Sequence, residues 1–175
     1  METGVGSGAV TGVDPTANAG LECDINRADA PYVVKAPHIC GTLDAVLAGG
    51  QVVVDHALVP VRDLYSAAES RRDVVRRSNS QLPPQLLAGG LFGTDDPAAQ
   101  EAALAARLYQ LIHTLAKHDV PTTLLHFPRL VEDPQYLFAK LRAVLPSGME
   151  YAAFLEGFRE VSKPELVHRF PAGQG

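Results

Sequence analysis

Short apolar runs along this chain alternate with segments whose apolar residues recur at helical spacing. The runs are rich in β-branched residues and predict strands at 31–35, 51–61 and 122–127. Helical spacing predicts a short helix ending at Gly49 and longer helices at 62–78, 98–119, 132–145 and 149–161. The order therefore predicts an α/β fold.

Local chemistry supports several of the predicted helix ends. Gly49 and Gly50 are typical of a helix C-terminus, and the pairs Asp96–Pro97 and Asp133–Pro134 are typical of helix starts. Between two predicted helices, residues 79–97 are rich in proline and glycine and indicate a long loop. We expect contacts with a substrate in that loop.

Alternating strands and helices favour a three-layer parallel sheet flanked by helices, with parallel core strands at 32–35, 52–60 and 122–127. Ligands of such sheets bind at the carboxyl ends of the strands. His38, Arg62 and Arg129 each lie just beyond a predicted strand. These three side chains are the first candidates for a binding edge.

Composition narrows the classes of function. Hydrophobic residues make up 46% of the 175 residues, and the formal net charge is −5, which argues against nucleic-acid or membrane-surface binding. The two cysteines, Cys23 and Cys40, form no metal-binding or disulfide pattern, and no signal peptide is recognisable, so we expect a cytoplasmic protein. We divide the chain into an irregular segment at 1–30, one domain at 31–165 and a tail at 166–175.

Arg62 ends the most strand-like run of the chain, and Ser66 and Ser70 follow at four and eight positions. The guanidinium group is a planar set of donors that suits phosphate or sulfate, and both serines fall near one face of the following helix. This spacing indicates an anion site. The alternative is that Arg62 pairs with Asp63 or Glu69.

Three segments in order resemble the sulfotransferase family, a branch of the P-loop fold: VVKAPH, VDHALVPVRDLYSAAES and TTLLHFPRLVEDPQYLFAKLRAVL. The resemblance covers residues 31 to about 146. It implies a fold like that of the P-loop NTPases and sulfotransferases. It also implies that Arg62 and Ser70 hold the 3′-phosphate of the sulfate donor PAPS, whose product is PAP.

The family usually begins with a strand and a glycine-containing loop that wraps the 5′-phosphosulfate of the donor. Here GVGSGAVTG, at 4–12, is the nearest counterpart, and Gly6, Ser7 and Gly8 are its candidate donor contacts. The loop contains no lysine or arginine, and only three residues precede it. We therefore expect a shortened or degenerate donor site and weak catalysis by this chain.

Two residues are candidates for catalysis. Lys35 resembles the family's lysine near the bridging oxygen of the donor. His38 lies near the family's catalytic histidine, although the spacing Lys-Ala-Pro-His is wider than usual. The alternative for His38 is that it caps a helix beginning at Ile39.

The resemblance implies sulfuryl transfer from PAPS to a hydroxyl of a small molecule or carbohydrate, with no metal ion. The negative net charge leads us to expect neither nucleic acid nor membrane as partner. Two alternatives remain. One is a non-catalytic or truncated relative. The other is a P-loop kinase or nucleotide-binding protein, although the chain has no Gly-x-x-x-x-Gly-Lys-Ser/Thr loop.

Overall fold

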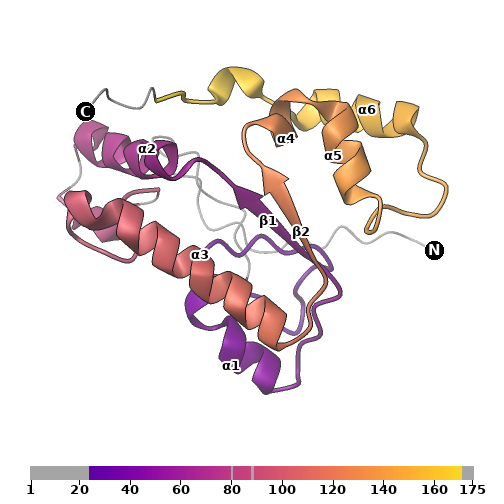
Figure 1. Cartoon of the computed structure of the whole chain (residues 1–175), viewed down its shortest axis with the longest axis horizontal. Coiled ribbons are helices and arrows are strands. Elements are labelled where there is room, and N and C mark those ends of the chain that lie inside the picture. Colours follow the sequence, from indigo (N-terminus) through magenta and orange to yellow (C-terminus); the bar gives the residue numbers. More distant parts are fainter. Residues whose placement is uncertain (1–23, 80, 88, 171–175) are drawn as a thin grey trace.

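The computed structural model describes residues 24–79, 81–87 and 89–170. The candidate donor residues Gly6, Ser7 and Gly8, and most of the segment at 1–30, lie outside these ranges. The described part contains six α-helices, two strands and four short 3₁₀ helices (Figure 1). In chain order they are η1 (Ile39–Gly41), α1 (Leu43–Ala48), β1 (Ala57–Val61), α2 (Leu64–Arg77), η2 (Pro84–Leu86), η3 (Pro97–Ala99), α3 (Gln100–Lys117), β2 (Thr122–His126), α4 (Arg129–Glu132), α5 (Pro134–Leu141), α6 (Tyr151–Val161) and η4 (Pro164–Leu166).

The two strands pair in parallel, which confirms an α/β fold with a small parallel sheet. Ala57 lies opposite Thr122, and Val61 lies opposite His126. Parallel strands cannot be joined by a tight turn, and here the connection runs through α2 and α3. The carboxyl ends of β1 and β2 therefore meet at one edge.

The predicted strand at 31–35 was wrong. Within that segment Tyr32 and Val33 are 88% and 80% exposed, and only Lys35 lies in an isolated β-bridge. The predicted strand at 51–61 is shorter in the structure and starts at Ala57. Residues 52–56 do not pair with β2, and Val53 is 84% exposed. A strand needs a hydrogen-bonded partner, and apolar composition alone does not supply one.

The main core lies between β1 and the helices α1 and α3. Leu43, Val59 and Leu115 are buried together there. In Figure 1, α1 and α3 lie on one side of the strands, and α5 and α6 lie on the other. The helical spacing of Leu104, Leu108, Leu111 and Leu115 predicts one buried face of α3. Leu115 is buried as this spacing predicts, whereas Leu108 is 37% exposed.

On each face of the two-stranded sheet, one strand has a buried central residue and the other strand has an exposed one. Side chains alternate between faces, so Val59 and its partner Leu124 share one face, and Leu58 and Leu125 lie on the other. Val59 and Leu125 are buried, but Leu124 and Leu58 are 49% and 41% exposed. The exposed leucines are therefore on opposite faces and form no common patch.

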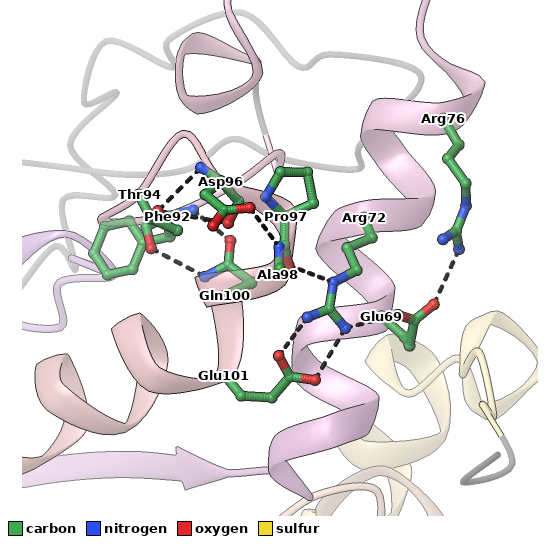
Figure 2. A network of polar contacts seen from close by, with 10 residues as sticks. All are labelled: Glu69, Arg72, Arg76, Phe92, Thr94, Asp96, Pro97, Ala98, Gln100 and Glu101. Atoms are coloured by element: carbon green, nitrogen blue, oxygen red, sulfur yellow. Dashed lines mark hydrogen bonds and ion pairs between the residues drawn. The ribbon is translucent and has the colours of Figure 1, made fainter. Parts of the chain in front are cut away.

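A charged network fixes α2 against the start of α3 (Figure 2). Arg72 donates from Nη1 to the carboxylates of Glu69 (2.7 Å) and Glu101 (2.9 Å), and from Nε to the Pro97 carbonyl (2.7 Å). Its side chain is only 15% exposed. The adjacent arginines at 71–72 and 76–77 predict a solvated helix face, and the burial of Arg72 contradicts that prediction.

The long loop before α3 is held by a buried side chain. Gln100 is fully buried, and its amide accepts from the Phe92 N–H (2.8 Å) and donates to the Phe92 carbonyl (3.0 Å). Asp96 caps the turn that leads into α3 by accepting from the Ala98 N–H (2.8 Å), as its sequence position indicates. Within the described ranges, no helix is long and apolar enough to cross a membrane.

We predict that Leu115→Ala lowers the free energy of unfolding by about 2–5 kcal/mol, because it leaves a cavity between α3 and β1. Leu108→Ala on the same helix is the matched control, since Leu108 is 37% exposed and Leu115 is 3% exposed. Urea denaturation measures both. Equal losses in the two variants would contradict the packing described here.

A second prediction concerns acid stability. The bond from Arg72 lowers the pKa of the Glu101 carboxyl, and another bond from Arg72 lowers that of Glu69. A carboxyl with a lowered folded-state pKa stabilises the fold above its unfolded pKa, about 4.3 for Glu. That contribution is lost as the pH falls through the folded-state pKa.

Glu101→Gln should therefore reduce stability at pH 7 and weaken its dependence on pH between about 5 and 3. Urea midpoints across that range test the expectation. Glu156→Gln, at an exposed site on α6, is the control for removing one carboxylate. An unchanged pH profile in Glu101→Gln would show that Glu101 contributes nothing to acid stability.

Candidate functional site

Arg62 is the first residue after β1, and it begins the turn into α2. The turn is fixed by Asp63, whose carboxylate accepts from the Ser66 N–H at 2.8 Å and caps α2. Local sequence therefore explains why the strand stops and the helix starts within two residues. Arg62 is placed at the carboxyl edge of the sheet, as predicted.

Strand β2 brings a second set of residues to the same edge. The Phe127 N–H donates to the Val61 carbonyl at 2.8 Å and continues the parallel pairing by one residue. The Arg62 guanidinium then lies over the Phe127 ring, with 5.0 Å between Cζ and the ring centroid. Two segments far apart in the chain are thus side by side at Arg62.

A cavity of about 310 Å³ opens at this edge. It lies between the β1–α2 turn, the end of β2 and the C-terminal segment, and its lining combines two arginines with two phenylalanines. The lining residues are Arg62, Asp63, Ser66, Phe127, Pro128, Val167, His168, Arg169 and Phe170. Such a cavity is at the lower end of the sizes that hold small ligands.

Electrostatics leave the Arg62 cation poorly compensated. Burial lowers the pKa of Arg62, and the nearby Asp63 charge raises it by less. The Asp63 carboxylate is itself engaged at the start of α2, where the Ser66 N–H lowers its pKa. Within the described ranges, neither Asp63 nor Glu69 forms an ion pair with Arg62, and Glu69 binds Arg72 and Arg76 instead.

The two candidate serines differ in position. Ser66 lines the cavity, whereas Ser70 is not among the lining residues. The next residue, Arg71, donates to the Gly90 carbonyl (2.7 Å) and lies over the Phe92 ring (5.2 Å). Burial lowers the pKa of Arg71. The part of α2 around Arg71 therefore faces the long loop.

The catalytic candidates lie outside the cavity. His38 contacts the ring of Phe92, with 5.1 Å between centroids, and Lys35 lies in its isolated β-bridge. His38 occupies the position before η1 but makes no capping hydrogen bond with its side chain. Neither residue lines the cavity beside Arg62.

Arg129 does not line the cavity and contacts Asp133 and Tyr136 instead. Its Nε donates to Asp133 at 3.0 Å, and its guanidinium lies 4.3 Å from the centroid of the Tyr136 ring. The sequence places two acids, Glu132 and Asp133, close after Arg129, and Arg129 pairs with Asp133. Asp133 also caps α5 by accepting from the Tyr136 N–H at 2.9 Å.

Sequence reasoning did not identify the aromatic and C-terminal residues of the cavity. Phe127 is the last residue of the predicted strand at 122–127 and directly follows β2, so strand-end position was a usable signal for it. Arg169 and Phe170 lie in a stretch without periodicity, and no local pattern indicates that they return to Arg62. Only the folded path of the chain reveals them.

A larger cavity, about 500 Å³, lies at the α5–α6 connection and includes Phe138, Arg142, Glu150 and Tyr151 in its lining. It contains none of the residues that the sequence singled out. Across the described residues, no group of three or more His, Cys, Asp or Glu side chains could hold a metal ion. The cavity at Arg62 is thus the better candidate.

Comparison with protein-family models, with curated proteins and with solved structures finds no significant match to this chain.

Proposed function

We propose that this chain is a sulfotransferase-like protein that binds the nucleotide PAPS, or its product PAP, at the carboxyl edge of the β1–β2 sheet. The observation that carries the proposal is Arg62, a partly buried guanidinium at a strand end that lines a cavity together with Ser66. Charge-assisted bonds from arginine suit a phosphate group. The nucleotide itself is named from the sequence resemblance.

The proposed architecture is a three-layer, P-loop-like sheet. It is supported by the parallel pairing of β1 and β2, because both strands belong to segments that carry the resemblance. It is also supported by helices on both sides of the strands (Figure 1). The proposal extends this arrangement to further parallel strands.

The residues near the cavity suit one phosphate group. Arg62 supplies charged donors, and the Ser66 hydroxyl supplies a neutral donor. The volume of about 310 Å³ holds a phosphate with part of a ribose more readily than a whole nucleotide. The Phe127 ring beside Arg62 offers an apolar surface for the rest of the ligand.

In the proposed reaction, the acceptor hydroxyl attacks the sulfur of PAPS. The new O–S bond forms while the bond between sulfur and the 5′-phosphate oxygen breaks, and PAP leaves. His38 takes the proton of the hydroxyl, and Lys35 stabilises the charge on the leaving oxygen. The acceptor is a small molecule or carbohydrate.

A second candidate function is a non-catalytic relative that binds the nucleotide without transferring sulfate. It is favoured by the position of Lys35 and His38, which lie outside the cavity of Arg62. Labelled sulfate transfer from PAPS to a broad panel of hydroxyl acceptors separates the two. Turnover that His38→Ala abolishes supports the enzyme, and PAP binding without turnover supports the non-catalytic relative.

We predict that Arg62→Ala weakens PAP binding tenfold or more, because a hydrogen bond to a charged group contributes about 1.5–3 kcal/mol. Isothermal titration calorimetry measures the affinity. Arg77→Ala is the matched control, since Arg77 lies at the far end of α2, is 71% exposed and removes the same charge. Equal losses in both variants, or no binding by the parent chain, would refute this site.

The two serines give an independent prediction. Ser66→Ala should weaken PAP binding by about two- to tenfold, as expected for one neutral hydrogen bond. Ser70→Ala should change it less, because Ser70 does not line the cavity. The same titration tests both. The reverse order would place the phosphate further along α2, where the sequence resemblance puts it.

A further inference from the structure

The C-terminal segment, defined here as residues 167–170, returns to the carboxyl edge of the sheet after α6. Figure 1 shows the chain crossing from α6 past α4 toward α2. On the way, the Ser162 hydroxyl donates to the Val131 carbonyl at 2.6 Å, and η4 follows. The guanidinium of Arg169 then pairs with the carboxylate of Glu132 on α4.

This segment accepts a hydrogen bond from one donor of Arg62. The Nη2 group of Arg62 donates to the main-chain carbonyl of His168. The guanidinium also lies 5.8 Å from the centroid of the Phe170 ring, in addition to its contact with Phe127. A phosphate that takes a two-pronged bond from the Arg62 guanidinium through Nη2 would compete with the His168 carbonyl for that donor.

The two possible partners of Arg62 differ in strength. A carbonyl oxygen is a neutral acceptor, whereas a phosphate oxygen is charged and forms a bond roughly twice as strong. The segment is also weakly attached, since the side chain of Arg169 is 74% exposed and that of Glu132 is 35% exposed. An exposed ion pair of this kind stabilises a segment only weakly.

We propose that the C-terminal segment is an internal competitor for Arg62. It satisfies the arginine while the site is empty, and it leaves when a phosphate-bearing ligand binds. This inference rests on the proposed function, because it assumes an anionic ligand at Arg62. It adds a regulatory contact to that site. Glu132 on α4 controls this contact by pairing with Arg169 of the segment.

The first test weakens the segment without changing the residues of the cavity. Glu132→Gln removes the partner of Arg169 and leaves Arg62, Ser66 and Phe170 intact. We expect PAP affinity to rise about two- to fivefold in calorimetry, which corresponds to the loss of one exposed ion pair. Glu165→Gln, an exposed acid in η4, controls for the change in net charge.

The second test follows the segment itself. Trypsin cleaves after arginine, so the rate of cleavage after Arg169 reports how often the backbone of the segment leaves the edge of the sheet. We expect PAP to accelerate this cleavage severalfold, although a bound ligand usually protects a protein. Cleavage after Arg159 in α6 is the internal control and should not accelerate.

A ligand-free arm separates the two proposals. Arg62→Ala should accelerate cleavage after Arg169 without PAP, because the segment loses its carbonyl and ring contacts. Unchanged cleavage in Arg62→Ala would overturn the contact. Faster cleavage in Arg62→Ala with no PAP binding by any variant would overturn the proposed function and the competition with it. The competition alone would be overturned by two results together: PAP affinity unchanged in Glu132→Gln, and a rate of cleavage after Arg169 that PAP does not change.

Discussion

The parallel pairing of β1 with β2 is the constraint on which the candidate site depends. It continues one residue beyond the strands, through the bond from the Phe127 N–H to the Val61 carbonyl. Both strands end at the same edge of the sheet. Arg62 and Phe127 are therefore neighbours, although they are far apart in sequence. A crossover through α2 and α3 makes this direction possible, since a tight turn would reverse it.

Arg62 has an environment that suits exchangeable partners. Its guanidinium is partly desolvated, it lies near two aromatic rings, and its bonded acceptor is a neutral carbonyl. A cation in such a place gains more from an anion than a fully hydrated surface arginine does. The same physical property thus underlies both the ligand site and the contact with the C-terminal segment.

The network around Arg72 joins α2, the helix that begins at this edge, to the start of α3. By joining Glu69 on α2 to Glu101 on α3, it fixes α2 against the helix that packs on β1. Gln100 adds a second restraint, since its buried amide is hydrogen-bonded to both the N–H and the carbonyl of Phe92. Phe92 in turn contacts His38 and Arg71, so the long loop connects these two residues.

Local chemistry determined the helix boundaries. Acidic caps followed by proline begin η3 and α5, and both starts were predicted from Asp96 and Asp133. Strands β1 and β2 were predicted as well, because each combines a short apolar run with turn residues beyond it. The position of Arg62 at a strand end followed from that pattern. These features depend on neighbours in sequence, so the sequence contains them.

Tertiary structure alone decided the features that need distant partners. The apolar segment at 31–35 is not a strand, since an extended run becomes one only by pairing, and Tyr32 and Val33 remain exposed. Arg72 pairs with Glu101 across two helices and is not a solvated side chain. Sequence could not indicate this, because Glu101 lies beside Arg72 only after folding. The carbonyl of His168 reaches Arg62 for the same reason. A main-chain oxygen has no residue identity, so no sequence pattern could have indicated that contact.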